Sequence, residues 1–275
     1  MTPDPKPGIL FAVDTSNWQE GITADITRLW AQAGVNHAVV KMGGGNVGVY
    51  ELSTHRPQVA AYRAAGIPAS RYWFNGRDAS IDAQVAAVRA QLAATPLAAG
   101  ERFVWDVENE GTTPRWTPAE VEQAARALAD LVPLARQVVY LSAAATRDVD
   151  WSTVVRLGLG LMVADYGANT GQPVSVPLVG HWPRGQVWLW QYTDQGRLPG
   201  YGGNLDLSTG GLNAVWTVFD LQTALNKVMG SDLVVDGDPG AKTAAVVVAF
   251  QTKYGLTPDG VAGPKTLTKL AEVAG

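Results

Sequence analysis

Short runs of apolar and β-branched residues recur along most of the chain, and this pattern predicts eight β-strands. The runs cover residues 11–14, 37–42, 69–74, 102–108, 137–142, 159–166, 186–192 and 204–207. Between the first five runs, a helical period extends over residues 24–33, 53–65, 78–94 and 118–131. Thr117 and Pro118 are residue types preferred where a helix begins, and Gly34 and Gly66 are preferred just after one ends.

The alternation of strands and helices predicts parallel strands joined by right-handed crossovers. Eight strands in series favour a closed barrel over an open sheet. Residues 167–185 and 193–203, which connect the last three strands, are rich in glycine and proline and are expected to lack ordinary helices. The predicted fold is therefore α/β, with an irregular, TIM-like eight-stranded β/α barrel.

A change of pattern after Asp206 predicts a second, smaller domain. The segment Ser208-Thr209-Gly210-Gly211 is expected to break the last strand, and a helical period follows over residues 219–228. Residues 236–243 and 259–266 both read D-G-x-x-G-x-K-T, and each is expected to open a helix. We predict a small C-terminal all-α domain of three helices. The predicted organisation is a flexible N-terminal arm (1–8), the barrel (9–208), a linker (209–217) and the C-terminal domain (218–275).

The composition fits a folded protein and narrows its partners. Of the 275 residues, 47% are hydrophobic and 17% are charged, which is typical of globular domains and not of disordered chains. The net charge is -4 and Lys and Arg do not cluster, so we expect neither nucleic acid nor a membrane as partner. The chain has no cysteine, which excludes thiol catalysis and Cys-ligated zinc. We expect a monomer.

Two carboxylates share one strand face in the segment Phe103-Val104-Trp105-Asp106-Val107-Glu108. Strand alternation places Asp106 and Glu108 on the same side, about 6 to 7 Å apart along the backbone. Glycosidic cleavage uses such a pair, because one group protonates the departing oxygen and the other stabilises or captures the positive centre. Crowding would also raise the pKa of one of the two carboxyls. We predict that this pair is catalytic.

Asp14 and Asp206 are expected to join the pair. They lie at the ends of the first and last predicted strands, which are neighbours in a closed barrel, and barrel enzymes carry their chemistry at the carboxyl ends of strands. The alternatives are an Asx turn or helix cap for Asp14 and a turn for Asp206. The candidate substrate-binding residues near strand ends are Trp18, Tyr72, Asp165, Tyr166, Trp190, Gln191 and Tyr192. Other aromatic residues on strands are expected in the core.

Other chemistries find little support in the sequence. A zinc hydrolase would need clustered nitrogen ligands, but His37, His55 and His181 are far apart and no H-E-x-x-H occurs. There is no G-x-S-x-G nucleophile elbow, and neither D-G segment has the Glu that ends a calcium loop. Gly43-Gly44-Gly45 lacks the spacing of a phosphate-binding motif and is predicted to be a flexible loop at the rim. We therefore predict no metal and no cofactor.

Five segments in a fixed order carry a resemblance to a known family. Residues 11–19, 106–108, 163–167, 190–193 and 204–207 together resemble the glycoside hydrolase family 25 muramidases over roughly residues 9 to 208. The resemblance implies a barrel that hydrolyses the β-1,4 bond from N-acetylmuramic acid to N-acetylglucosamine. Glu108 would be the proton donor, and Asp106 would stabilise the transition state or orient the acetamido group. Asp14 and Asp206 would complete the acidic cleft.

The chain departs from the family pattern at two places. After Lys41 the family usually continues as Ala-Thr-Glu-Gly, whereas this chain has Met42-Gly43-Gly44-Gly45 and so lacks an acidic residue at the rim. Trp73 stands where His is common. These differences affect the subsites and the preference for modified walls, but they leave the four carboxylates in place.

Residues 221–270 are similar to the peptidoglycan-binding domain common in cell-wall hydrolases. Together the two resemblances imply bacterial peptidoglycan as the partner and a phage endolysin as the most consistent protein class. Residues 1–13 lack the features of a signal peptide, so we expect synthesis in the host bacterial cytoplasm and action on the wall after release. The alternative is a non-catalytic wall-binding or virion structural protein.

Overall fold

The computed structural model describes residues 10–110, 113–173, 177–210 and 215–274. The predicted arm of residues 1–8 and residues 211–214 of the predicted linker lie outside this part. Within it, no helix is long and apolar enough to cross a membrane.

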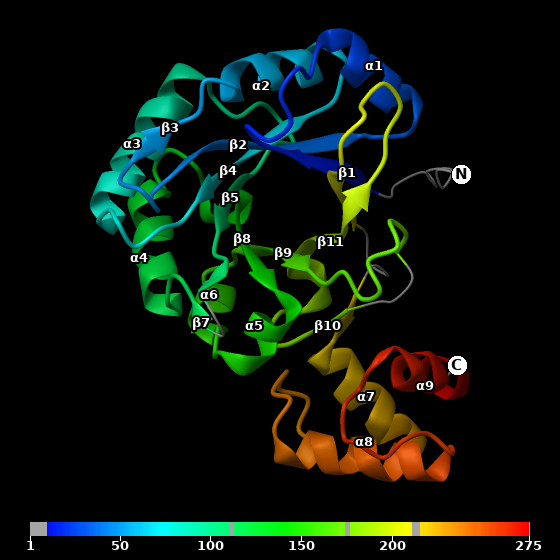
Figure 1. Cartoon of the computed structure of the whole chain (residues 1–275). Coiled ribbons are helices and arrows are strands. Elements are labelled where there is room, and N and C mark those ends of the chain that lie inside the picture. The colour runs from blue at the N-terminus through cyan, green and yellow to red at the C-terminus, as the bar shows by residue number, and fades with distance from the viewer. Residues whose placement is uncertain (1–9, 111–112, 174–176, 211–214, 275) are drawn as a thin grey trace.

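A closed barrel forms the larger part of the molecule (Figure 1). Its strands, in chain order, are β1 (Leu10–Thr15), β2 (His37–Gly44), β4 (Ala69–Phe74), β5 (Phe103–Asp106), β8 (Gln137–Ser142), β9 (Gly160–Ala164), β11 (Val187–Gly196) and β12 (Leu205–Gly210). Each strand pairs with the next along the chain, and β12 pairs with β1 to close the ring. The predicted eight-stranded barrel is confirmed.

Helices cover the outside of the first half of the barrel, as Figure 1 shows. They are α1 (Ala24–Gln32), α2 (His55–Ala64), α3 (Ile81–Ala94) and α4 (Pro118–Leu128), followed by the short α5 (Ala143–Asp148) and α6 (Ser152–Arg156). Thr117 caps α4 in a reciprocal capping box with Glu120, and Pro118 occupies its first turn. Gly34 and Gly66 have φ angles of 97° and 76°, which glycine adopts without strain after a helix.

The second half of the barrel is irregular, as predicted. Between β9 and β11, the described residues form only β10 (Leu178–Val179) and the 3-10 turn Arg184–Gln186. Strand β12 is antiparallel to both its neighbours, while the other seven strands of the barrel pair with one another in parallel. The break predicted from Ser208 is wrong, because Ser208 pairs with Ala12 and the strand continues to Gly210.

The glycine run after Lys41 is also not the flexible loop that the sequence predicted. Gly43 and Gly44 belong to β2 and pair with the two-residue strand β3 (Tyr50–Glu51). A Cβ on Gly43 would lie 2.1 Å from the Tyr50 carbonyl oxygen, and one on Gly45 would lie 2.2 Å from Gln84 Oε1. Glycine is therefore required at these positions, because any side chain would clash with the neighbouring residues of the rim.

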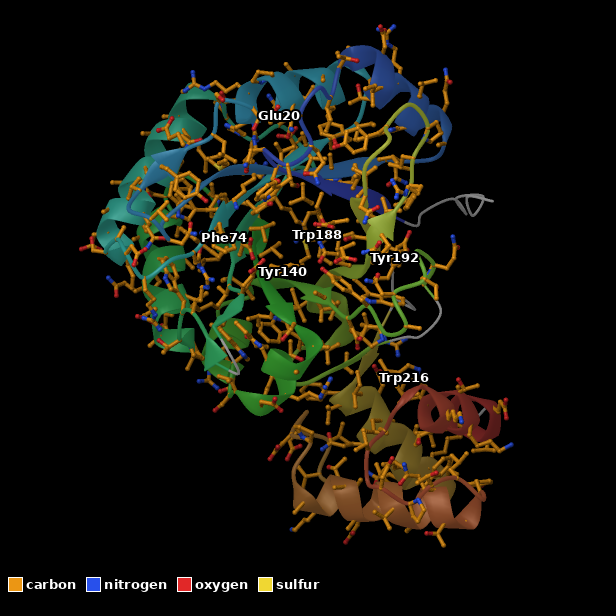
Figure 2. The ribbon with its side chains drawn as sticks, viewed as in Figure 1. Glu20, Phe74, Tyr140, Trp188, Tyr192 and Trp216 are labelled. Carbon is orange, nitrogen blue, oxygen red and sulfur yellow. The ribbon has the colours of Figure 1, made fainter. Side chains whose placement is uncertain are left out.

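The C-terminal domain consists of three helices below the barrel in Figure 1. They are α7 (Val218–Met229), α8 (Ala241–Lys253) and α9 (Pro264–Ala274). Leu221, Leu225, Phe250 and Leu270 lie in its buried core. Trp216 of β13 (Trp216–Thr217) packs against this core and lies between the barrel and the helices in Figure 2.

The D-G-x-x-G-x-K-T repeat forms two equivalent hydrogen-bond networks in this domain. Gln222 Nε2 donates to Asp236 Oδ1 at 2.8 Å and to Thr243 Oγ1 at 3.3 Å. Gln251 Nε2 donates to Asp259 Oδ1 at 2.8 Å and to Thr266 Oγ1 at 3.1 Å. In each repeat a buried glutamine from the preceding helix therefore holds the aspartate turn against the start of the next helix.

The remaining short elements lie at the edges of the barrel. They are β6 (Asn109–Glu110), β7 (Thr113–Pro114) and the 3-10 turn Leu134–Arg136. β6 and β7 pair with each other beyond the end of β5, so they form a small hairpin beside the mouth of the barrel.

Candidate active site

The lining of the barrel changes from apolar to polar within two residues along most strands. The apolar floor includes Ala12, Val39, Val104, Val138, Met162 and Leu189. Two residues further along their strands are Asp14, Lys41, Asp106, Tyr140 and Gln191. Since strand side chains alternate in direction, both layers face the barrel interior, and the second layer forms the floor of an open mouth.

Two connected hollows occupy this mouth. The deeper one has a volume of about 360 Å³, and the cleft above it one of about 1270 Å³. Both are lined by Asp14, Tyr72, Asp106, Glu108 and Asp206. Figure 2 shows side chains filling the inside of the barrel, with Tyr140 labelled near its centre and Phe74 to the left. All four predicted catalytic carboxylates therefore lie in one site.

Asp14 and Asp206 face each other across the β1–β12 pair, where they are direct register partners. Because β12 is antiparallel, Asp206 stands near the start of its strand and still reaches the rim formed by the carboxyl ends of the others. Burial, and then the charge of Asp206, raise the pKa of Asp14 well above its ordinary value. Burial, followed by repulsion from Asp194 and Glu108, raises the pKa of Asp206 to about 6.

Gln191 fixes the orientation of Asp14. Its Nε2 donates a hydrogen bond to Asp14 Oδ2 at 2.8 Å. Its Oε1 accepts hydrogen bonds from the Tyr140 hydroxyl at 2.8 Å and the Tyr166 hydroxyl at 2.7 Å. Ser208 Oγ adds a longer bond of 3.4 Å to Asp14 Oδ2. The amide of Gln191 therefore bridges one carboxylate to two phenols.

Asp106 is the deeper member of the predicted catalytic pair. Its side chain is buried, with 6% of the residue exposed, and it lies in register with Phe74 and Tyr140. Burial and then the charge of Glu108 raise its pKa, while Lys41 acts in the opposite direction. Glu108 lies just beyond the end of β5 and is exposed at the open side of the cleft. The two carboxylates thus differ in environment, as an acid–base pair requires.

Two buried carboxylate oxygens in the site have no hydrogen-bond partner among the described residues. They are Asp14 Oδ1 and Asp106 Oδ1, which are both buried. Buried acceptors without hydrogen bonds are unfavourable, and both residues line the deeper hollow. These two oxygens are therefore unsatisfied acceptors on residues that line the hollow.

The predicted substrate-binding residues fall into two groups. Trp18 is 82% exposed and lines the cleft, and Tyr72 lines both hollows. Gln191 lines the deeper hollow, and Tyr166 lies behind it as a hydrogen-bond donor. The remaining three, Asp165, Trp190 and Tyr192, do not line either hollow.

Those three residues instead stabilise the wall behind the site. Trp190 Nε1 donates to the Asp165 carbonyl oxygen at 2.8 Å, and Asp165 Oδ1 accepts the Gly167 amide at 3.3 Å. Tyr192 is buried against Trp190, with ring centroids 5.8 Å apart. A direct contact of these residues with a substrate stays a prediction.

Several cleft residues were not among the sequence candidates, and they include Lys41, Asn46, Tyr50 and Phe74. Lys41 and Phe74 lie on predicted strands, and their alternation with buried neighbours could have indicated them. Asn46 and Tyr50 had no such signal, because the segment after Lys41 reads as a glycine-rich loop. Among the described residues, no group of three or more His, Asp or Glu could hold a metal ion.

The family model of the glycosyl hydrolases family 25 matches residues 13–201. This range includes the barrel strands from β2 to β11 and the carboxylates Asp14, Asp106 and Glu108, while Asp206 lies just beyond it. The chain belongs to this family. Its barrel is therefore a glycoside hydrolase domain. A model of a peptidoglycan binding domain matches residues 217–270, which span α7, α8 and most of α9.

Solved structures of family 25 proteins share the barrel fold. The virulence factor GHIP of Streptococcus pneumoniae is 16% identical, with a TM-score of 0.58, over 74% of this chain and 87% of that one. The catalytic domain of the endolysin ply40 from Listeria monocytogenes bacteriophage P40 is 18% identical, with a TM-score of 0.55, over 76% of this chain and 98% of that one. At these identities the likeness concerns the fold.

A curated relative resembles only a short part of this chain. The zinc D-Ala-D-Ala carboxypeptidase of Streptomyces albus G is 46% identical over 44 residues, which are 16% of this chain and 17% of that protein. The chain thus spans less than a fifth of the length of this relative.

Proposed function

We propose that the protein is a muramidase that hydrolyses the β-1,4 bond between N-acetylmuramic acid and N-acetylglucosamine in bacterial peptidoglycan. The observation that carries this proposal is the convergence of Asp14, Asp106, Glu108 and Asp206 in one cleft of a family 25 barrel. The C-terminal domain, matched by a peptidoglycan-binding family, holds the enzyme on its polymeric substrate.

Glu108 is the proton donor in this proposal. It is exposed at the open side of the cleft, where a glycan strand enters, so its carboxyl can reach the oxygen that departs. Asp106 lies deeper and faces the positive charge that develops on the sugar, or the acetamido group beside it. Asp14 and Asp206 complete the acidic cleft on the opposite wall.

The proton donor is tested by replacing Glu108 with Gln, which keeps the size of the side chain and removes its acidity. We expect the rate of wall lysis to fall by a factor of about 10² to 10⁴, which is the usual contribution of a general acid. Its binding to purified walls should be unchanged, because the C-terminal domain is intact. Full lytic activity of the variant would disprove the assignment.

The bond that is cut is tested by mass spectrometry of digested peptidoglycan. Fragments with reducing muramic acid ends support a muramidase. Reducing glucosamine ends would indicate a glucosaminidase instead, and release of stem peptides without glycan cleavage would refute a glycosidase.

We further propose that the protein is a phage endolysin, made in the cytoplasm of the host bacterium and acting on the wall as a monomer after release. The fold likeness to the endolysin of Listeria bacteriophage P40 and the match to a wall-binding family support this context. Expression inside bacteria tests it, since lysis should begin only when the inner membrane is made permeable. Lysis without permeabilisation would contradict the proposed location.

A further inference from the structure

Two cationic side chains lie around one aromatic ring at the mouth of the cleft. Lys41 Nζ is 4.3 Å from the ring centroid of Phe74, and Arg115 Cζ is 4.9 Å from the same centroid. Lys41 and Phe74 line the cleft. The backbone N–H of Arg115 donates to the Glu108 carbonyl oxygen at 2.9 Å, so Arg115 is fixed next to the proposed proton donor.

Neither cation has an ion-pair partner within 4.0 Å among the residues that the structure describes. Arg115 Nε is buried and makes no hydrogen bond there. Burial lowers the pKa of Lys41, the charges of Asp106 and Glu108 oppose this change, and the charge of Arg115 lowers the pKa further. An aromatic ring stabilises two neighbouring cations only weakly compared with a carboxylate. Asp106 and Glu108 attract Lys41 from beyond ion-pair distance, so neither cation is held by direct contact with a carboxylate among the described residues.

We propose that Lys41 and Arg115, held on the Phe74 ring, recognise a carboxylate of the substrate and make the enzyme select glycan strands that carry one. The inference rests on the proposed muramidase function. Four carboxylates line the same cleft, so a negative substituent on the sugar would be repelled there without a local positive charge. The two cations offset that repulsion at one wall, and the planar Arg115 guanidinium suits a carboxylate in particular.

Muramic acid brings this chemistry to the cleft in two ways. Its lactyl group ends in a carboxylate when no peptide is attached. When a stem peptide is attached, the free carboxylates of the peptide extend from the same position. Both sources present the same group to Lys41 and Arg115, and they differ in the distance from the sugar ring.

The test compares four synthetic tetrasaccharides of alternating N-acetylglucosamine and N-acetylmuramic acid. The first has free lactyl carboxylates and the second has them as methylamides. The third carries L-alanyl-D-glutamate on each lactyl group, and the fourth carries the diamide of that dipeptide. The ratio of kcat/KM between each charged substrate and its neutral counterpart measures selection, and comparison of the two pairs identifies the source.

We expect the wild-type enzyme to favour at least one charged substrate over its neutral counterpart by about tenfold, as a charge-assisted contact allows. Lys41→Gln and Arg115→Gln should each reduce that ratio to within about twofold. Arg115→Lys keeps the positive charge but loses the planar guanidinium that can donate two hydrogen bonds to one carboxylate. This variant should therefore retain part of the preference. Using a ratio separates selection from any general loss of activity caused by the altered field at Asp106.

Arg102→Gln is the matched control. Arg102 also lies over an aromatic ring, with Cζ 5.3 Å from the centroid of Trp188, but it lines a hollow with residues that begin strands, at the opposite end of the barrel. This variant should keep the wild-type ratio.

Three results would overturn the inference. A wild-type enzyme that cleaves charged and neutral substrates equally has no such selection. Variants that lose activity equally on both members of a pair would show that Lys41 and Arg115 only support the catalytic carboxylates. Cleavage of none of the four tetrasaccharides would refute the proposed muramidase itself, and this failure is distinct from cleavage without preference.

Discussion

Gln191 donates a hydrogen bond of 2.8 Å to Asp14, and this bond joins the first strand of the barrel to the seventh across the interior of the mouth. The same amide accepts the hydroxyls of Tyr140 and Tyr166, so four residues from four strands or strand ends form one network. Among the residues that the structure describes, Oδ1 of Asp14 has no hydrogen-bond partner. Asp14 is therefore held through its Oδ2 atom in the wall of the deeper hollow.

Gln191→Met should remove this network and leave buried groups without partners. Because Asp14 and two phenols each lose a hydrogen bond, the free energy of unfolding should fall by about 2 to 4 kcal/mol. Tyr166→Phe removes only one donor and should lower it by about 1 kcal/mol. Urea unfolding followed by tryptophan fluorescence measures both. Equal stability of the Gln191 variant and the wild type would show that the network contributes nothing.

Asp206→Asn should stabilise the protein in a pH-dependent way. The folded protein holds the Asp206 proton up to a pKa of about 6, whereas an unfolded aspartate releases it near 3.9. The folded state therefore binds more protons between these values, and its stability falls as the pH rises from about 4 to about 6. The amide removes this loss, so the variant should gain about 2 to 3 kcal/mol at pH 7.5 and about 1 kcal/mol at pH 4.5.

Urea unfolding at the two pH values checks this prediction. Asp130→Asn is the contrasting variant, because Arg89 lowers the pKa of that exposed carboxyl to about 2. It should give no gain at pH 7.5. A gain for Asp206→Asn that is the same at both pH values would contradict a titration effect.

Gly45→Ala should destabilise the β2–β3 rim. The new methyl group would lie 2.2 Å from the side chain of buried Gln84, which also bonds Gly76 and Trp73 and cannot easily move. Overpacking of this kind lowers stability by about 1 to 3 kcal/mol. Gly202→Ala is the control, because nothing lies within 4 Å of its Cβ position. Thermal unfolding of both variants compares them, and equal melting temperatures would contradict the packing of the glycine run.

Gln251→Leu should unfold or loosen the C-terminal domain without affecting the barrel. The substitution removes the three hydrogen bonds that Nε2 donates and the bond that Oε1 accepts from the Gly260 amide at 2.9 Å. We expect loss of wall binding in a co-sedimentation assay and unchanged cleavage of soluble oligosaccharides. Thr252→Val, an exposed neighbour on the same helix, is the control and should bind normally. Loss of cleavage in the Gln251 variant would mean that the two domains depend on each other.

Much of the fold is a local property of the chain. The strand runs and the helical period are visible residue by residue, since apolar alternation and caps such as Thr117 depend on neighbours in sequence. The glycine run was misread for the opposite reason. A glycine required by the approach of Tyr50 and Gln84 has the same sequence appearance as a glycine in a loose loop.

The site divides in the same way. The sequence determined which side chains were available: the Asp106 and Glu108 pair on one strand end, and carboxylates on the first and last strands. Only the tertiary structure decided their environments. The antiparallel course of β12 brings Asp206 opposite Asp14, and closure of the barrel buries Asp106 while Glu108 stays exposed. Burial, and charges on residues that are far apart in the sequence, determine the pKa values and the exposure of these side chains. No local sequence pattern encodes them.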